Sequence, residues 1–433
     1  MATASRFGRL WGRGHETFTP SLRRIISVKG PSATTYLQGL VTSDLNQDPT
    51  SPVPQDLAGA SPPPEDDPVV EFNPKLRSTC FLDNKGRILT DAFLWKHAED
   101  HYLVDVPANS ATSLLDHLKQ YKLRRTKVDI HDVSDKVSSH VIYGTLNGGS
   151  PPPGYVTGLD PRHPNMGMRV LSMEHPPNHF PELVANGFPG VPGTYNVLRK
   201  FAGIAEGSEL IGKTALEANQ EWLGAVSFHK GCYLGQELTA RTQHTGIIRK
   251  RFMPMILVDT QQEIPRPWIM AHQIQEGREE LYNELKDQPP LPNLSSPAVG
   301  ALLTMMTMGS FGHEDEEKKE DDVLALQKES EQFVQEIHEV ATPGVKMIDT
   351  TDDKAIGQIV ATPAPGTSLV LAQMRLDRIG FGEGGSPWSR TNKIRLGDTD
   401  KEYRYLPYTP LWWPKVNTAT GKAKEEDHES VHD

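Results

Sequence analysis

Cys232 lies in a segment whose residue types could activate its thiol, and it is one of only two cysteines in the chain. An unperturbed cysteine has a pKa of about 8.5 and is mostly protonated at neutral pH, whereas the thiolate is the nucleophile and the metal ligand. His229 and Lys230 place positive charge next to this thiol. Gly231 and Gly235 remove side chains on either side of it, which allows backbone N–H groups or a partner to come close.

The residues after the cysteine predict a short helix. The stretch 236–242 contains neither glycine nor proline, so Cys232 is expected just before a helix N-terminus, where the dipole favours an anion. The alternative is that Cys232 is a buried core residue, as free cysteines often are. Gln236, Glu237 and Arg241 argue against a core segment, because each polar group would need a buried partner.

Length and composition limit the classes of protein to consider. A chain of 433 residues can form two or three domains with real cores. The net charge of −11 is concentrated in two segments, 313–322 with seven acids against two lysines and 415–433 with five against three. The remainder has no strong positive field, so nucleic acid is not predicted as a partner. Two cysteines without a CxxC motif predict neither a disulfide framework nor a closed zinc site.

The N-terminus has the features of a mitochondrial transit peptide. No acid precedes Glu16, and Arg6, Arg9 and Arg13 fall on one side of a helical wheel. Phe7, Leu10 and Trp11 fall on another side. An acid-free, arginine-bearing amphipathic start is typical of such peptides, although an untidy basic N-terminus is also common. No apolar run approaches the roughly 20 residues of a membrane span, so a soluble protein without a membrane span is expected.

The first half of the chain predicts mixed helices and strands. Patterns of apolar residues indicate strands near 25–28, 81–95, 102–106, 128–131 and 141–145, and helices over 32–40, 110–121 and 195–205. The second of these strand segments is a hairpin with its turn at 83–86. The proline-rich stretch 48–67 is expected to be a surface loop.

The second half predicts a small barrel with a long insertion. Strand patterns occupy 247–258, 345–348, 356–361 and 369–376. Between them, residues 259–342 are rich in polar residues and contain the acidic run, so they are expected to be largely disordered, with a helix near 322–340. The tail 414–433 is also expected to be disordered.

With these residues in view, the chain resembles the YgfZ branch of the glycine-cleavage T-protein superfamily. The resemblance extends to its eukaryotic form, the mitochondrial iron-sulfur cluster assembly factors of the Iba/Caf type. It covers roughly residues 20–258 and 343–376, and its most specific element is Lys230–Glu237, which follows the pattern K-G-C-aromatic-x-G-Q-E. The supporting matches are Gly30 with Leu37-Gln38-Gly39-Leu40, Asp83 to Asp91, Asp160-Pro161-Arg162 and Leu216-Glu217-Ala218-Asn219.

The chain also departs from the family pattern. Ala215 stands where proline usually precedes the Leu-Glu-Ala-Asn motif, and Glu221 stands where aspartate usually follows it. T-proteins that transfer an aminomethyl group carry adjacent acids after the glycine-rich turn, whereas here Thr90 precedes Asp91. Aminomethyl transfer is therefore not expected, and the insertion lies outside the shared pattern.

The resemblance implies an α+β fold, a T-protein-like ring of mixed αβ modules with a C-terminal antiparallel β-barrel. It implies a transit segment over 1–17, a folate-binding-like module over 18–250 and a barrel domain over 251–413 that contains the insertion. Relatives use the central channel of the ring for a folate. Ligands often bind at such junctions between modules.

The function that the resemblance implies is that of a factor in the mitochondrial matrix rather than an enzyme. It would act with A-type scaffold proteins to mature 4Fe-4S clients such as aconitase and lipoate synthase. One cysteine cannot hold a cluster alone, so Cys232 is expected to supply one ligand, or a redox contact, to a transient cluster shared with a partner. The residues expected around this contact are Lys230, Gly231, Tyr233, Gly235, Gln236, Glu237 and Arg241.

Two other functions remain as alternatives. A tetrahydrofolate-dependent one-carbon transferase would use Asp91 as a pterin or amine contact, although this residue could equally cap a strand end. A cysteine hydrolase would need a histidine base within hydrogen-bond reach of Cys232, and His229 and His244 are the nearest in sequence. This second alternative ranks last.

Overall fold

The computed structural model describes ten stretches of the chain. They are residues 14–47, 75–143, 153–162, 166–173, 193–260, 331–379, 393–407, 413–414, 416–417 and 420–423. The expected proline-rich loop over 48–67 and most of the long insertion lie outside these ranges. Residues 1–13, with the arginines of the expected transit segment, also lie outside them.

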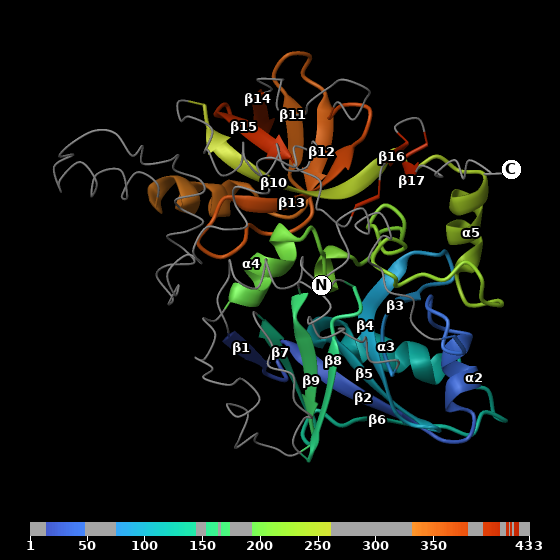
Figure 1. The fold of residues 1–433 in the computed structure, drawn as a ribbon. Coiled ribbons are helices and arrows are strands. Elements are labelled where there is room, and N and C mark those ends of the chain that lie inside the picture. The colour runs from blue at the N-terminus through green and yellow to red at the C-terminus, as the bar shows by residue number, and fades with distance from the viewer. Residues whose placement is uncertain are drawn as a thin grey trace, which may run out of the picture.

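A five-stranded antiparallel sheet forms the first module (Figure 1). Its strands, in spatial order, are β3 (Leu76–Leu82), β4 (Ile88–Ala98), β5 (His101–Pro107), β2 (Arg23–Lys29) and β6 (Asp129–Asp132). Helices α2 (Ala33–Gln38) and α3 (Ala108–Gln120) bury Leu37, Leu114 and Leu118 against one sheet face. The predicted hairpin over 81–95 is confirmed, since β3 pairs with β4 across the turn.

A four-stranded sheet packs on the other face of the first. Its order is β1 (Gly14–Phe18), β7 (Ser138–Tyr143), β9 (Met168–Ser172) and β8 (Tyr155–Leu159). Leu171 of this sheet joins Phe93 and Trp95 of the first sheet in one buried cluster. Residues 14–17 of the expected transit segment belong to β1, since residues 14–18 pair with β7, and Phe18 is in the core.

The C-terminal half is a closed antiparallel barrel, drawn at the top of Figure 1. Around the barrel the strands are β10 (Lys250–Asp259), β13 (Leu369–Arg375), β12 (Ala355–Ile359), β11 (Lys346–Asp349), β14 (Lys393–Leu396) and β15 (Glu402–Pro407). The sequence did not predict β14 and β15. Residues 331–340 are helical, within the helix expected near 322–340, and bury Phe333 and Ile337 in the barrel cluster.

Two connecting segments complete the described structure. Helix α4 (Thr194–Phe201) lies between the barrel and the sheets, and α5 (Gln236–His244) lies at the edge of the molecule (Figure 1). Part of the expected disordered tail is instead a short hairpin of β16 (Val416–Asn417) and β17 (Lys422–Ala423). The predicted α+β class with a C-terminal barrel is confirmed. None of the helices in the described ranges is both long and apolar enough to cross a membrane.

Candidate functional site

The cysteine segment is a surface loop that leads into α5. Cys232 is exposed, and the helix begins four residues later at Gln236, as the sequence predicts. A Cβ atom built on Gly231 would meet nothing within 4 Å. The space on one side of the thiol is therefore open to an approaching molecule.

Gly235 fixes the path of this loop. Its φ of 78° lies in the left-handed region, and a Cβ there would come 2.5 Å from the carbonyl oxygen of Asp83. The β3–β4 turn also has a glycine at this contact, Gly86, on which a Cβ atom would come 2.7 Å from the Gly235 carbonyl oxygen. Two backbones thus meet where no side chain fits.

Lys230 anchors the other side of the loop. Its ammonium donates to three backbone carbonyl oxygens, those of Gln38 at 2.7 Å, Val41 at 2.6 Å and Ser43 at 3.0 Å. Burial lowers the pKa of Lys230 to about 8, and the nearby carboxylate of Asp44 opposes this shift. These contacts give Lys230 a structural role that the sequence did not predict, because its three donors are directed at the last residue of α2 and the segment that follows it.

The other residues of the signature divide into anchors and exposed groups. The Gln236 side-chain oxygen accepts from the Tyr233 backbone N–H at 2.8 Å, and the Tyr233 ring lies 4.8 Å from the Lys230 nitrogen. Burial raises the pKa of the Tyr233 hydroxyl to about 12. Glu237 and Arg241 are exposed and lie one turn apart on α5, where a partner could reach them.

The motifs that carry the family resemblance meet around this loop. The Leu234 N–H donates to the carbonyl oxygen of Gly39 at 3.0 Å, which joins the signature to the Leu-Gln-Gly-Leu motif. Gly235 joins it to the turn at Asp83. The Asn219 side chain donates to the Phe252 carbonyl at 2.8 Å, which ties the Leu-Glu-Ala-Asn motif to the barrel.

The second cysteine has a different environment. Cys80 is fully buried in β3 and its thiol lies 3.5 Å from the Gln220 side-chain oxygen. Burial raises the pKa of this thiol well above its usual value, and the nearby charge of Asp91 adds to the effect. Cys80 is therefore a core thiol, while Cys232 is the accessible one.

The described residues contain no group of three or more His, Cys, Asp or Glu side chains arranged to hold a metal ion. His229 and His244 are both exposed. The described contacts of His229 include a backbone N–H bond to the Ser227 hydroxyl at 3.3 Å, and no contact joins either imidazole to the Cys232 thiol. The hydrolase alternative thus gains no supporting geometry.

Asp91 is buried within the first module. One carboxylate oxygen accepts from the Gly207 backbone N–H at 2.8 Å. Burial raises the pKa of Asp91, the charge of Glu206 raises it further, and Arg23 opposes the shift. The contact with Gly207 holds the loop before the short helix Gly207–Glu209, which is a structural explanation for this aspartate.

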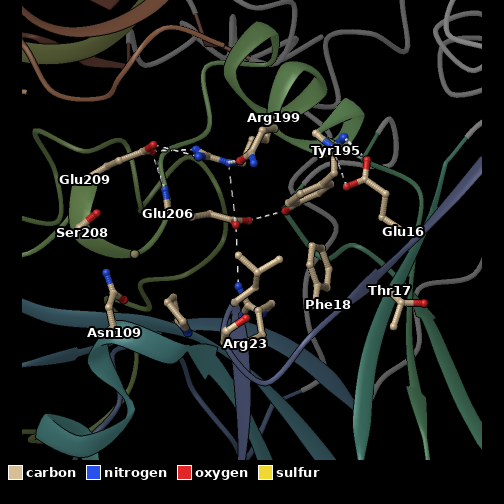
Figure 2. Close-up of a pocket in the computed structure, with 16 residues that line it drawn as sticks. Glu16, Thr17, Phe18, Arg23, Asn109, Tyr195, Arg199, Glu206, Ser208 and Glu209 are labelled. Atoms are coloured by element: carbon tan, nitrogen blue, oxygen red, sulfur yellow. Dashed lines mark hydrogen bonds and ion pairs between the residues drawn. The ribbon is translucent and has the colours of Figure 1, made fainter. Parts of the chain in front are cut away.

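A cavity of about 610 Å³ opens at the junction of the two sheets and the segment 193–209 (Figure 2). Charged and polar side chains from all three parts line it, among them Glu16, Arg23, Tyr195, Arg199 and Glu206. Asp91 is not among the lining residues. The residue proposed as the folate contact and the cavity therefore lie at neighbouring but different positions.

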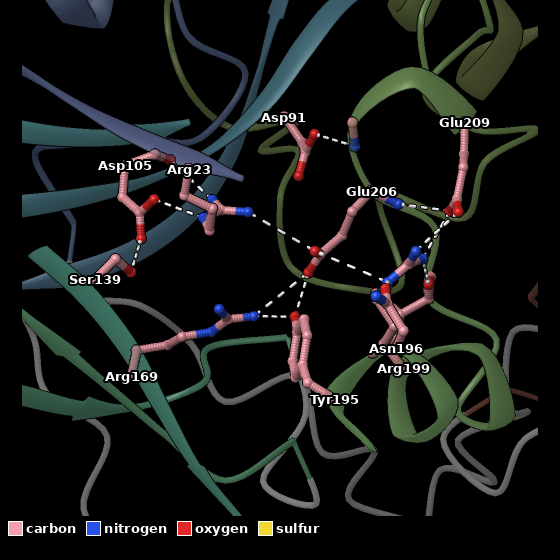
Figure 3. A network of polar contacts seen from close by, with 12 residues as sticks. Arg23, Asp91, Asp105, Ser139, Arg169, Tyr195, Asn196, Arg199, Glu206 and Glu209 are labelled. Atoms are coloured by element: carbon pink, nitrogen blue, oxygen red, sulfur yellow. Dashed lines mark hydrogen bonds and ion pairs between the residues drawn. The ribbon is translucent and has the colours of Figure 1, made fainter. Parts of the chain in front are cut away.

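Glu206 is the centre of a largely buried polar network that forms part of the wall of this cavity (Figure 3). Arg162 donates to its carboxylate at 2.6 Å, Tyr195 donates to it through its hydroxyl, and Arg169, Arg23 and Arg199 lie within 4.0 Å. Burial favours the neutral acid, but the arginines outweigh burial and hold the pKa of Glu206 far below its usual range. Asp160 and Asp105 pair with the same arginines at 2.8 Å and 2.6 Å.

Sequence reasoning missed most of this network. Arg23 is the first residue of β2 and Arg169 the second of β9, and each is itself buried in a strand that also contains buried apolar residues. A charged residue within such a strand pattern signals a buried partner. Arg162 was noted only as part of the Asp-Pro-Arg motif, and Glu206 and Tyr195 carried no local signal.

Comparison with solved structures identifies the class of fold. The structure matches the glycine cleavage system aminomethyltransferase T from Bartonella henselae with a TM-score of 0.54 and 11% sequence identity. The match covers 95% of this chain and 89% of the other. The chain therefore has the fold of the glycine-cleavage T-protein, as the resemblance predicted.

The sequence is similar to iron-sulfur cluster assembly factor IBA57 homologues described as mitochondrial. The identity is 37% over 264 residues for the protein of Chaetomium globosum and 34% over 245 residues for that of Pyricularia oryzae. The homologue of Aspergillus oryzae is 33% identical over 271 residues. The matches span 55% to 57% of each relative's length and 55% to 56% of this chain. No family model matches. The chain is thus similar in sequence to these homologues and has a T-protein fold, which confirms the resemblance drawn from the signature.

Proposed function

We propose that this chain is a mitochondrial iron-sulfur cluster assembly factor that acts through Cys232. The observation that carries the proposal is an exposed cysteine on a loop fixed on both sides, by Gly235 against Asp83 and by Lys230 against the segment after α2. The printed names of the relatives add the class of activity and the compartment. The matrix is the proposed location within the mitochondrion.

In this proposal the cluster is cargo rather than a resident cofactor. The thiol of Cys232 gives its proton to solvent and its sulfur binds one iron, while the ligand that it displaces from this iron stays on the donor protein and takes up a proton from solvent. Iron in clusters prefers thiolate ligands, and a cluster needs more of them than one loop with a single cysteine supplies. The remaining ligands come from a partner, for which an A-type scaffold protein is the proposed candidate. The proposed clients are 4Fe-4S enzymes such as aconitase and lipoate synthase.

The signature residues support this role in different ways. Gly231 leaves the approach to the thiol open, and Lys230, Tyr233, Gly235 and Gln236 hold the loop in one shape. Pre-organisation of this kind lowers the entropy cost of binding a partner. Glu237 and Arg241 are proposed to contact the partner directly, because they are exposed on the helix that follows the loop.

The experiment is anaerobic mixing with a 2Fe-2S-loaded A-type scaffold protein, followed by size-exclusion chromatography and visible absorption. Wild type is compared with Cys232→Ser, and Cys80→Ala serves as the matched control at the buried cysteine. We expect a cluster-containing complex with wild type and with the control variant but not with Cys232→Ser. If all three chains yield the same complex with the same cluster content, the ligand role is excluded.

Within the described residues, the cavity is the one feature that supports the alternative function, binding of tetrahydrofolate for one-carbon transfer. Its volume of about 610 Å³ lies in the range of small-molecule sites, and its position at a junction between modules is typical of them. Against this candidate, the Asp91 carboxylate already accepts a hydrogen bond from the Gly207 N–H. The hydroxyl of its neighbour Thr90 donates to the Asp91 backbone carbonyl at 3.0 Å. Calorimetry with tetrahydrofolate and a turnover assay test binding and transfer separately.

A further inference from the structure

A run of exposed basic residues joins the end of α3 to β6. Over 119–127, hereafter the basic run, the sequence reads Lys-Gln-Tyr-Lys-Leu-Arg-Arg-Thr-Lys, and no acid occurs between Asp116 and Asp129. This composition stands out in a chain with a net charge of −11. The five basic side chains are all exposed, namely Lys119, Lys122, Arg124, Arg125 and Lys127.

The backbone of the basic run presents these side chains outward. The Thr126 N–H donates to the Leu123 carbonyl oxygen at 2.9 Å, which closes a turn with Arg124 and Arg125 at its corner positions. Leu123 is 58% exposed at the start of this turn. Within the described part of the chain, none of the five basic side chains makes an ion pair. The run therefore offers positive charge around one exposed apolar side chain.

Helix α2 connects the basic run to the cysteine loop. At its N-terminal end, Ser32 and Lys127 exchange two hydrogen bonds of 3.3 Å. At its C-terminal end, Gly39 accepts from Leu234 at 3.0 Å, and Lys230 donates to the adjoining carbonyls. A helix of six residues is about 9 Å long at 1.5 Å per residue, so a single protein partner could span both features. Figure 1 shows α2 and α5 on the same side of the molecule.

The chemistry of this surface favours a protein over a nucleic acid as the occupant. Single-stranded nucleic acid is commonly bound by basic grooves with exposed aromatic rings. Here Tyr121 is half-buried and its ring lies 4.9 Å from that of His117. An exposed leucine among basic residues instead suits an acidic protein surface with an apolar centre.

We propose that the basic run and Leu123 dock an acidic surface of the protein that shares a cluster with Cys232. The proposal rests on the assembly-factor function for the identity of that partner, but the contact itself requires no cluster. Complementary charge raises the association rate and orients the encounter, while the fixed loop presents the thiol to the partner's cluster.

The test measures the affinity of an A-type scaffold protein, apo and 2Fe-2S-loaded, as a function of ionic strength. The variant is K122Q/R124Q/R125Q, with L123S as a separate variant. The matched control, K346Q/K354Q/K393Q, removes three exposed lysines from the barrel. We expect the basic-run variant to raise Kd for the apo scaffold about tenfold at low salt and to flatten the salt dependence, with the control unchanged.

The outcomes separate the docking surface from the thiol. One outcome is that Cys232→Ser loses the cluster while K122Q/R124Q/R125Q keeps its affinity for the scaffold. This outcome would overturn the docking proposal and leave the assembly function intact. Weakened docking in that variant with no effect of Cys232→Ser would support the surface and remove the ligand role. Loss of binding to anionic vesicles or to single-stranded RNA, with scaffold affinity unchanged, would also overturn the proposal by assigning the run to another partner.

Discussion

Gly235 of the cysteine loop lies directly against Asp83 of the β3–β4 turn, close enough that a Cβ atom would come 2.5 Å from the Asp83 carbonyl oxygen. This contact joins a loop and a turn that are about 150 residues apart in sequence. It makes the shape of the cysteine loop depend on the first module. The position of Cys232 is therefore a property of the fold rather than of the signature alone.

Gly235→Ala is expected to lower the free energy of unfolding by about 2 kcal/mol, because the new Cβ clashes with backbone and the φ of 78° is strained for alanine. Gly231→Ala is the matched control within the same loop, since its Cβ would meet nothing within 4 Å. We expect Gly231→Ala to keep its stability but to weaken the scaffold complex by crowding the thiol. Urea denaturation and scaffold binding measure the two effects. Equal stability of both variants would show that Gly235 does not fix the loop.

Lys230→Met is expected to lower the free energy of unfolding by about 2 kcal/mol, because three carbonyl oxygens lose their donor in a partly buried site. The pKa of Lys230 in the folded chain is about 8 and its usual value is 10.5, so the unfolded chain binds more protons between these values. Relative to Lys230→Met, wild type should therefore gain stability as pH rises from about 8 towards 10.5.

Urea denaturation of both proteins on either side of pH 8 checks this slope. Lys250→Met, which removes an exposed lysine at the start of β10, is the control and should show no such dependence. A parallel pH dependence for wild type and Lys230→Met would contradict the burial of this ammonium.

Glu206→Gln is expected to lower the free energy of unfolding by about 3 kcal/mol at neutral pH, because it leaves buried arginines without their shared carboxylate. The pKa of Glu206 is depressed in the folded chain, so its contribution is present above the usual value of 4.5 and is lost as pH falls below it. The difference in the free energy of unfolding between wild type and Glu206→Gln should therefore become smaller as the pH falls below 4.5.

Thermal unfolding from neutral pH down through 4.5 measures this difference. Glu402→Gln is the control, since it breaks an exposed pair with Lys393 that contributes less than about 1 kcal/mol. A Glu206→Gln variant as stable as Glu402→Gln at neutral pH would refute the central place of Glu206 in the network.

Local patterns predicted the elements that depend on nearby residues. The 83–86 turn and the helix after Cys232 follow from glycine positions and from the absence of breakers, and both were predicted with ends close to those observed. Ser32 is a cap-type residue at the start of α2, but its hydroxyl accepts from the Lys127 N–H and makes no capping bond. The Lys127 backbone N–H, which lies 95 residues later in the chain, takes the Ser32 hydroxyl oxygen that a cap would use.

Contacts between distant segments were not predictable from local patterns. Lys230 was expected to place its positive charge next to the Cys232 thiol. Its ammonium instead donates to backbone carbonyl oxygens about 190 residues earlier in the chain. The pairing of Glu206 with Arg23, and of β14 with β11 in the barrel, likewise depends on long-range packing. The exposure of Cys232 followed from the polar character of its segment, which a core could not accommodate.

The measurement that tests the central claim most directly is NMR of this chain, labelled with ¹³C only at the cysteine Cβ, in an anaerobic complex with an unlabelled scaffold that carries a paramagnetic 2Fe-2S cluster. The chain has two cysteines, so two resonances are observed. The account predicts that the Cys232 signal undergoes a large hyperfine shift, while the buried Cys80 signal stays near its free-thiol position. Two signals that both stay at free-thiol positions in a complex that retains its cluster would contradict the claim that Cys232 ligates the shared iron.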